Sequence, residues 1–218
     1  NCSKMNLSQP IIMGVLNVTP DSFSDGGKFF DSDLAIKQAK SMVENGAGII
    51  DIGGESTRPG ASAVTVNDEL KRVIPVIEAL TKEIHVPISI DTSKPEVMEQ
   101  AISCGASIIN DVNALRAPGA LEMASKLKSD VCLMHMQGNP RTMQKNPIYA
   151  DVVEDIKSFF KERIKACESA GIDLSSITLD PGFGFGKNLG HNIALLKNLS
   201  EFHEFGVSIL AGLSRKSM

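Results

Sequence analysis

The sequence has only four cysteines, and no two of them are close together in the chain. Cys2, Cys104, Cys132 and Cys167 lie far apart, with no C-x-x-C motif and no histidine at zinc-finger spacing. A disulfide scaffold or a structural zinc site needs a recognisable set of spaced ligands, so this pattern disfavours both. We expect reduced thiols, buried inside a cytosolic protein.

The chain also lacks a large charge excess and a long apolar run. Its formal net charge is −4, from 22 basic and 26 acidic residues, and the Lys and Arg residues are scattered among acids. This excludes a basic stripe for nucleic acid, but not a local pocket for a small anion. No segment approaches the ~18 apolar residues of a membrane span, and the first ten residues lack the apolar core of a signal peptide. We therefore expect a soluble, cytoplasmic protein that binds neither nucleic acid nor membranes.

Two kinds of hydrophobic pattern alternate along the chain. Short runs rich in Ile and Val are apolar on both faces, and longer stretches of helical period separate them. This pattern is typical of repeated βα units around a parallel sheet, in one domain that spans residues 1–218. The strands are expected at 11–16, 48–52, 87–90, 107–109, 131–134, 177–179 and 207–211, and helices at 33–45, 67–80, 95–103 and 152–170.

Local signals define the ends of several helices. Ser32 is placed to cap the helix at 33–45, and Gly46, Gly105 and Gly171 are placed to end helices. Pro75 lies inside the 67–80 pattern, so we expect a kink or a late start there. The segments GAGIID (46–51) and GASIIN (105–110) repeat one another, each with a helix stop, a buried strand and a polar residue.

Each apolar run ends on groups that ionise or form hydrogen bonds. A helix cap explains any single one of them, but it does not easily explain the whole series. A closed (β/α)8 barrel gathers the carboxyl ends of all its strands at one rim, whereas an open doubly wound sheet does not. We therefore predict a TIM barrel whose eighth βα unit is missing from the sequence as it stands. The polar groups are Asn17, Asp51, Asp91, Asn110 with Asp111, His135, Asp180 and the cluster at 214–216.

Three βα loops carry possible chemistry. The loop NVTPDSFSDGG (17–27) contains Asp21 and Phe23 and suits a mobile lid, for which an ordinary surface loop is the alternative. The loop GGESTRPG (53–60) offers hydroxyl, amide and guanidinium donors for a phosphate, although a solvated turn would fit the same residues.

The loop DPGFGFGK (180–187) fails the spacing of a Walker phosphate loop, so we reject nucleoside triphosphate binding. A flexible pocket wall that carries phenylalanine fits better. His135, at the end of a strand, is more often a hydrogen-bonded structural residue than a metal ligand in such a place.

Taken in order, these segments resemble the signatures of the dihydropteroate synthase family. They are NVTPDSFSDGG, DIGGESTRPGA (51–61), SIDTSK (89–94), INDV (109–112), LMHMQG (133–138), LDPGFGFGK (179–187) and GLSRKSM (212–218). The family joins a pterin methyl pyrophosphate to 4-aminobenzoate in folate biosynthesis, and sulfonamide drugs occupy its 4-aminobenzoate pocket. One feature departs from the pattern, because the Arg-x-His pair that helps the family hold pyrophosphate on its last strand is absent.

The resemblance implies roles for the residues that hold the pterin. Asp180 would accept hydrogen bonds from the ring N–H and NH2 donors of the pterin, and this fits a carboxylate. Asp91 and Asn110 would satisfy the remaining polar ring atoms, and Lys216 would donate to the carbonyl and a ring nitrogen. The thioether of Met134 would pack against the face of the ring.

It also implies roles on the pyrophosphate and aminobenzoate sides. Asn17 would be the protein ligand of a Mg²⁺ ion that carries the pyrophosphate, since magnesium keeps most of its waters and takes other oxygens from phosphates. Thr57 and Arg58 would bind the pyrophosphate directly. The aminobenzoate pocket is expected to comprise Phe185 against the ring, Ser217 at the carboxylate, and Pro59.

The expected mechanism is direct displacement, because no activated nucleophile is apparent. The resemblance implies a dissociative route, in which carboxylates such as Asp91 and Asp180 stabilise a pterin cation. The 17–27 loop, with Asp21 and Phe23, would shield the reacting carbon from water. A homodimer is implied by the family alone. The alternatives are a methyltetrahydrofolate-dependent methyltransferase with a pterin-binding barrel and a pterin-binding paralogue without catalysis.

Overall fold

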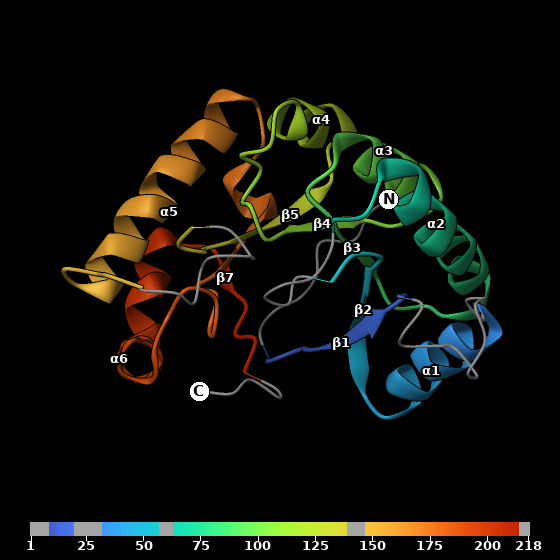
Figure 1. Cartoon of the computed structure of the whole chain (residues 1–218), viewed down its shortest axis with the longest axis horizontal. Helices are drawn as coiled ribbons and strands as arrows, with labels where there is room; N and C mark the ends of the chain where they lie inside the picture. The colour runs from blue at the N-terminus through green and yellow to red at the C-terminus, as the bar shows by residue number, and fades with distance from the viewer. Residues whose placement is uncertain (1–8, 20–31, 57–62, 139–146, 214–218) are drawn as a thin grey trace.

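The chain folds into a curled parallel sheet with helices on its outer face (Figure 1). The computed structural model describes residues 9–19, 32–56, 63–138 and 147–213. Each strand pairs in parallel with the next one along the chain, so β1 and β7 are the edges of the sheet. The strands are β1 (Ile12–Asn17), β2 (Ala47–Gly53), β3 (Ile88–Asp91), β4 (Ile108–Asp111), β5 (Asp130–Met134), β6 (Ile177–Asp180) and β7 (Ser208–Ile209).

The helices follow the strands in alternation, as the hydrophobic pattern predicts. They are α1 (Ser32–Glu44), α2 (Val66–Glu83), α3 (Pro95–Ser103), α4 (Ala120–Leu127), α5 (Val152–Ser169) and α6 (Leu189–Lys197), with 3-10 turns η1 (Leu174–Ser176) and η2 (Leu199–Phe205). The seven strands within the described ranges confirm the barrel class of the fold. The expected strand at 207–211 is shorter than predicted, and Ser32 is the first residue of α1 instead of its cap.

Local chemistry sets the ends of these helices. The Thr65 hydroxyl accepts from the Asp68 N–H at 3.2 Å at the start of α2, and Asp151 accepts from Val153 N–H at 2.9 Å at the start of α5. Gly46 and Gly105 end helices with φ of 99° and 112°, and only glycine adopts this left-handed region at little cost. From Pro75 we expected a kink or a late start of this helix; α2 begins at Val66, so the late start is wrong and the kink stays a prediction.

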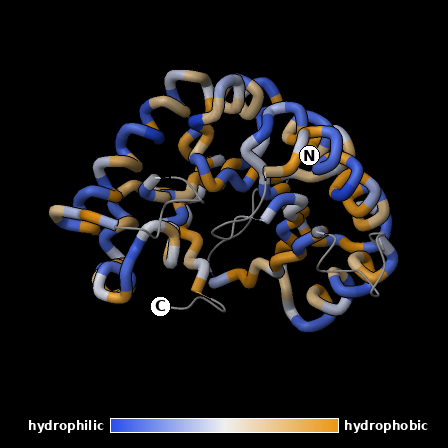
Figure 2. The backbone as a smooth tube through the Cα atoms, in the orientation of Figure 1, coloured by the Kyte–Doolittle hydropathy of each residue, from blue (hydrophilic) through white to orange (hydrophobic). Residues whose placement is uncertain are grey.

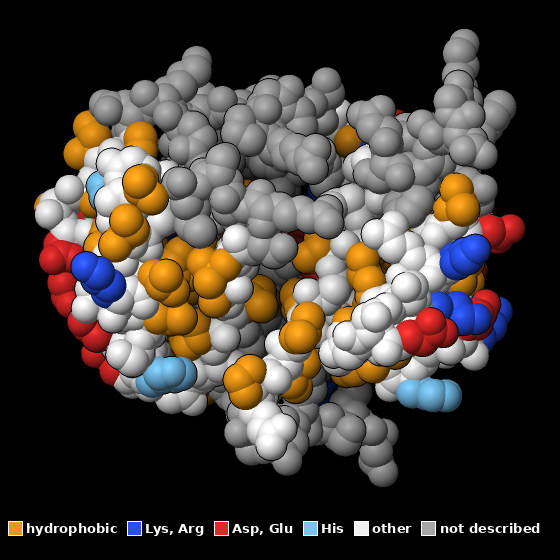
Figure 3. All heavy atoms as spheres, turned by 90° about the horizontal axis from the view of Figure 1, so that it is seen from below, with side chains coloured by type: hydrophobic (Ala, Val, Ile, Leu, Met, Phe, Trp, Pro, Cys, Tyr) orange, Lys and Arg blue, Asp and Glu red, His pale blue; other side chains and the backbone are white. Residues whose placement is uncertain are grey.

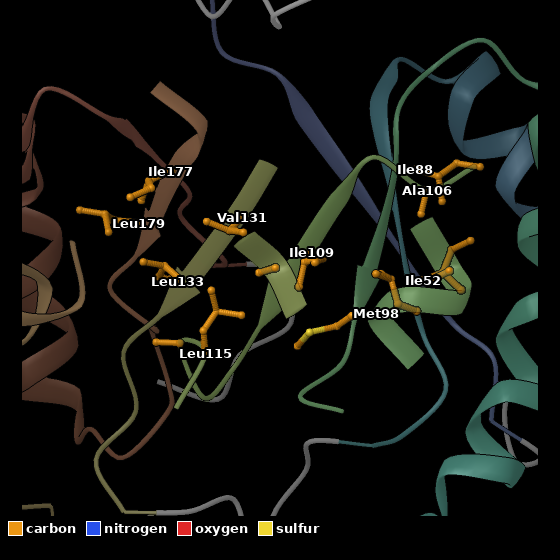
Figure 4. Packing of buried hydrophobic residues seen from close by; sticks show 14 of the residues in the cluster. Ile52, Ile88, Met98, Ala106, Ile109, Leu115, Val131, Leu133, Ile177 and Leu179 are labelled. Carbon is orange, nitrogen blue, oxygen red and sulfur yellow. The ribbon is translucent and has the colours of Figure 1, made fainter. Parts of the chain in front are cut away.

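The hydrophobic core lies between the outer face of the sheet and the helices. Ile52, Ile90 and Ile109 are register neighbours on β2, β3 and β4, all are fully buried, and they pack with Met98 of α3 (Figure 4). Figure 2 shows the same division, since the strands are mostly hydrophobic while the helices alternate hydrophilic and hydrophobic residues. Burial of this face turns the intervening side chains of each strand toward the inside of the curl.

The edge strand β1 is exposed where the central strands are not. Ile12 is 65% exposed and Val15 is 54% exposed, whereas Ile50 and Ile90 are fully buried. Hydrophobic side chains also gather near the middle of the face that Figure 3 presents. Among the described residues, no helix combines the length and the apolar character that a membrane crossing requires.

The cysteine prediction is correct in one part and wrong in another. Cys104, Cys132 and Cys167 are free thiols, and Cys2 lies outside the described residues. Cys132 and Cys167 are buried as expected, but Cys104 is only half-buried because it sits at the exposed end of α3.

Candidate active site

The register of the sheet places one row of polar side chains on its inner face. Asn17 lies opposite Gly53, Gly53 opposite Asp91, and Asp91 opposite Asn110. The residue before each of these belongs to the buried outer face, so these side chains alternate inward. Asp180 is on the inner face of β6 by the same rule. The carboxyl ends of separate strands thus bring these polar groups to one mouth.

Gly53 leaves space between two of these side chains. A β-carbon placed on Gly53 would lie 3.4 Å from Oδ2 of Asp91 and 3.8 Å from Oδ1 of Asn17. The two oxygens therefore border the same small gap, and Asn17 is exposed to solvent. Burial raises the pKa of Asp91 well above its usual value, and the nearby carboxylates of Asp51 and Asp111 raise it further.

Asp51 orients the side chain of Asn110 through a hydrogen bond. The Asn110 Nδ2 donates to Asp51 Oδ2 at 3.0 Å, so the amide oxygen of Asn110 faces away from that carboxylate. Asp51 is only 4% exposed, and its other oxygen, Oδ1, has no hydrogen-bond partner among the residues that the structure describes. Burial raises the pKa of Asp51, and the side chains of Ser89 and Asn110 oppose this in part. Sequence reasoning noticed Asp51 at the end of a strand but assigned it no role.

Asp180 and Met134 lie side by side on β6 and β5. They are register partners, and both are buried. Asp180 Oδ1 accepts from the Gly182 N–H at 2.7 Å, which fixes the plane of the carboxylate. Met134 belongs to a small apolar cluster with Met136, Val112 and Phe185. An acceptor for ring donors and an apolar surface therefore adjoin one another.

Asp111 does not belong to this mouth, although we grouped it with Asn110 at the rim. Its carboxylate accepts from the backbone N–H groups of Asn113 and Leu115, each at 2.8 Å, and contacts the Ser93 hydroxyl. Being next to Asn110 on the strand, it points to the opposite face, where it holds the turn after β4. Asp111 therefore has a structural role, although it holds this turn and does not cap the following helix, α4.

A lysine ties together the loops that follow β2 and β3. Lys94 forms ion pairs with Glu55 and with the buried Glu69 of α2. We call these three residues the Lys94 cluster. Glu55 also accepts from the Val64 N–H at 3.1 Å, so it holds both ends of the segment 57–62. Sequence reasoning missed this cluster, because Glu55 and Glu69 lie 39 and 25 residues from Lys94 in the chain.

A second lysine lies buried under the loop that follows β6. Lys187 is 3% exposed, and its Nζ lies 2.9 Å from the Gly182 carbonyl, 3.0 Å from the Phe185 carbonyl and 3.1 Å from Nδ1 of His135. We call Lys187, His135 and these two carbonyls the Lys187 cluster. The ammonium group faces the interior of the protein, which agrees with the rejection of a Walker loop.

His135 serves as a structural acceptor, as we predicted. Burial lowers its pKa to about 2, and the adjacent Lys187 and Arg116 charges contribute to the shift. The ring is therefore neutral at physiological pH and can accept from the Lys187 ammonium group. Its face is closed by Phe159, whose ring centroid lies 4.9 Å away.

Several predicted site residues lie outside the described ranges. They are Asp21 and Phe23 of the proposed lid, Thr57, Arg58 and Pro59 of the second loop, and Lys216 and Ser217 after β7. Within the described ranges, no group of three or more His, Cys, Asp or Glu side chains could hold a metal ion by itself.

Comparison with known proteins gives concordant results. Residues 13–218 match the family described as pterin binding enzyme. The dihydropteroate synthase of Escherichia coli K12 is 56% identical over 216 residues, which cover 99% of this chain and 77% of the relative.

Two solved structures superpose closely on this fold. The Yersinia pestis dihydropteroate synthase, in a sulfonamide drug complex, matches with a TM-score of 0.93 and 54% identity over 98% of this chain and 78% of the other. The Xanthomonas albilineans dihydropteroate synthase with 4-aminobenzoic acid matches with a TM-score of 0.92 and 52% identity, over 98% of this chain and 76% of the other.

Proposed function

The chain belongs to the dihydropteroate synthase family of pterin binding enzymes, and we propose that its polar mouth performs the family's reaction with the residues described above. The enzyme is a transferase of folate biosynthesis. It condenses 6-hydroxymethyl-7,8-dihydropterin pyrophosphate with 4-aminobenzoate and releases 7,8-dihydropteroate and pyrophosphate. The convergence of Asp91, Asn110 and Asp180 at one mouth is the observation that carries the assignment of residues to this reaction.

The mouth complements the polar edge of a pterin. Asp180 has one oxygen fixed by the Gly182 N–H, so its carboxylate is held ready to accept from the ring N–H and exocyclic NH2 donors. Asn110, held through its nitrogen by Asp51, presents its amide oxygen as a further acceptor. Met134 supplies an apolar, polarisable surface for one ring face. Lys216 is proposed to donate to the pterin carbonyl and a ring nitrogen.

The same carboxylates suit the chemical step. In the proposed dissociative route, the bond from the methylene carbon to the pyrophosphate oxygen breaks and leaves a pterin cation. The amine nitrogen of 4-aminobenzoate then attacks that carbon and loses a proton. Asp91 and Asp180, in surroundings of low dielectric, stabilise the positive charge as it develops. Asp21 and Phe23 of the 17–27 loop are proposed to exclude water during this interval.

The residues at the Gly53 gap fit a magnesium ion that arrives with its substrate. The Asn17 amide oxygen is exposed and borders the gap together with Asp91, but the described residues hold no set of three acidic or imidazole ligands. Mg²⁺ that takes one protein oxygen and completes its shell with waters and pyrophosphate oxygens matches this arrangement. When bound, the ion would neutralise charge on the leaving pyrophosphate. Thr57 and Arg58 are proposed to bind the same pyrophosphate.

We propose that 4-aminobenzoate lies nearer to solvent than the pterin. Phe185 is half-buried beside Met134 and Met136, which places an aromatic ring next to the proposed pterin pocket. Ser217 would bind the carboxylate, and Pro59 would complete the wall. The complexes of the Yersinia pestis and Xanthomonas albilineans enzymes with a sulfonamide drug and with 4-aminobenzoic acid support a pocket of this kind, and sulfonamides are expected to compete here.

A homodimer and a cytoplasmic location complete the proposal. Helix α6 exposes Leu189, Ile193 and Leu196 at i, i+4 and i+7, a stripe that a second copy could cover. The sedimentation coefficient of the purified protein tests this state, and a monomer at micromolar concentration would exclude it.

The decisive assay follows pyrophosphate release from the pterin pyrophosphate. We expect release to depend on 4-aminobenzoate and to cease in Asp180→Asn. Pyrophosphate release that is independent of 4-aminobenzoate, or pterin binding without turnover, would favour a non-catalytic paralogue. Methyl transfer from methyltetrahydrofolate would favour the methyltransferase alternative.

A further inference from the structure

The loop at 181–186 alternates glycine with bulky residues. Gly182, Gly184 and Gly186 all have positive φ, at 70°, 76° and 61°, so the backbone reverses tightly between them. Phe183 is buried in the core, while Phe185 joins the Met134 cluster at the mouth. The loop therefore presents its two phenylalanines to different surroundings, and its backbone conformation decides where the Phe185 ring lies.

The loop is wrapped around a buried cation. Lys187 places its ammonium group against two carbonyl oxygens of the loop itself, those of Gly182 and Phe185. His135 completes the cage with its ring nitrogen and with its own carbonyl at 3.4 Å. A buried ammonium group is costly without such acceptors, and here they belong to the backbone of the loop and to the end of β5.

The two ends of the loop depend on this cation to different degrees. Gly182 is also fixed by the Asp180 carboxylate and by packing so close that a β-carbon there would lie 2.0 Å from the His135 carbonyl oxygen. Phe185 is linked to Gly182 in two ways, because its N–H donates to the Gly182 carbonyl at 3.0 Å and the ammonium group joins the two carbonyls. Loss of the ammonium would remove a donor from each carbonyl and one of these two links, so the Phe185 end would be held less firmly.

We propose that Lys187 is a positioning residue for the arylamine substrate: its caged ammonium group sets the loop conformation that holds the Phe185 ring in the aminobenzoate pocket. The inference rests on the proposed role of Phe185 in that pocket. It gives a function to the lysine that follows the glycine-rich segment, which a phosphate-binding role does not explain. The pterin pocket keeps its own anchors at Asp180 and Asn110, so its affinity should not follow that of the arylamine.

The test uses Lys187→Ala and Lys187→Met in steady-state kinetics. We expect the KM for 4-aminobenzoate to rise about tenfold in both, with kcat and the Kd for pterin pyrophosphate within roughly twofold of the parent enzyme. n-Propylammonium should restore the KM of Lys187→Ala, because it replaces the missing chain and its N–H donors. It should not restore Lys187→Met, whose side chain fills the space, and tetramethylammonium should restore neither.

Lys157→Met provides the matched control. Lys157 is also buried and has ion pairs with Glu154, Glu201 and Glu204, but it lies on α5 away from the mouth. Lys157→Met should lower the Tm without a selective rise in the KM for 4-aminobenzoate. If Lys187→Ala does not fold, Lys187→Met carries the test through the split between KM and kcat.

Phe185→Ala separates this inference from the proposed function. An unchanged KM for 4-aminobenzoate in Phe185→Ala would refute the role of Phe185 itself. A raised KM in Phe185→Ala together with an unchanged KM in both Lys187 variants would overturn the positioning role. A uniform loss of all kinetic parameters without rescue by n-propylammonium would also overturn it, because it would mark Lys187 as structural only.

Discussion

Two lysines support two loops at the same mouth, but they do so with different partners. In the Lys94 cluster, the ammonium group contacts the carboxylates of Glu55 and Glu69, and Glu55 is partly exposed. In the Lys187 cluster, it contacts backbone carbonyls and the neutral ring of His135. Carboxylates on flexible side chains tie one loop to a neighbouring helix, whereas carbonyl acceptors shape the loop that supplies them.

This difference predicts which measurements should respond to each lysine. The Lys94 cluster joins β2, α2 and β3, so it should act mainly on stability and on the segment 57–62 that is proposed to bind pyrophosphate. The Lys187 cluster lies within the 181–186 loop and β5, so it should act mainly on the aminobenzoate pocket. The comparison would fail if Lys94 variants changed mainly the aminobenzoate pocket, or if Lys187 variants changed mainly stability and the 57–62 segment.

The largest stability effect is expected for Lys94→Met. Glu69 is 1% exposed, and the variant leaves its carboxylate buried without its ammonium partner. Loss of one partner of a buried ion pair costs about 3–5 kcal/mol, which urea denaturation would measure. The double variant Lys94→Met, Glu69→Leu should recover much of this free energy of unfolding, since both charges then leave the interior. Equal stability of the single variant and the parent enzyme would contradict the role of the pair.

A smaller and more selective effect is expected for Glu55→Gln. The variant weakens the contacts with Lys94 and with the Val64 N–H, which hold the two ends of the 57–62 segment. The KM for pterin pyrophosphate should rise roughly fivefold with little change in Tm, because one partly exposed charged contact is lost. Glu83→Gln, which removes an exposed ion pair with Lys40, is the control and should leave the KM unchanged. A raised KM for 4-aminobenzoate alone would instead place Glu55 with the other loop.

The smallest effect is a pH dependence that Asp51 imposes on stability. Burial raises its pKa above the ordinary 3.8, so the folded protein binds a proton here that the unfolded chain has released. The parent enzyme should therefore lose stability relative to Asp51→Asn as the pH rises from about 4 through the raised pKa. Tm values of the two proteins at several pH values measure this difference. The Tm of Asp51→Asn minus the Tm of the parent enzyme should increase with pH, and a decrease would contradict the prediction.

Sequence periodicity was sufficient to predict the order of strands and helices. Strands that are buried on both faces consist of short runs of apolar residues, which are easy to recognise in the sequence. It located every strand to within a few residues and the ends of helices at Gly46 and Gly105. It missed α4 and α6, which are short, and α6 starts from a cap in which His191 pairs with Asn188 in place of an acidic partner. Of the two outcomes expected from Pro75, the late start is wrong, because α2 runs from Val66 through that position.

The site was less predictable, because side-chain direction and distant partners are not written in local sequence. Asn110 and Asp111 are neighbours of similar polarity, and only the register shows that one faces the mouth and the other the turn after β4. Glu55, Glu69 and Lys94 belong to two successive βα units and are brought together only by the tertiary structure. The inward positions of Asp91 and Asp180, by contrast, follow directly from where their strands end.

The central claim is that inward carboxylates at the mouth bind the pterin, and a pair of matched variants tests it most directly. Asp180→Asn and Asp111→Asn change the same group at the ends of two strands, one facing the mouth and one facing the outer turn. Calorimetric titration with the pterin pyrophosphate should show that Asp180→Asn loses affinity about a hundredfold, since a charged acceptor for two donors is lost. Asp111→Asn should bind as tightly as the parent enzyme even if its Tm falls. Equal affinity in the two variants would contradict the account.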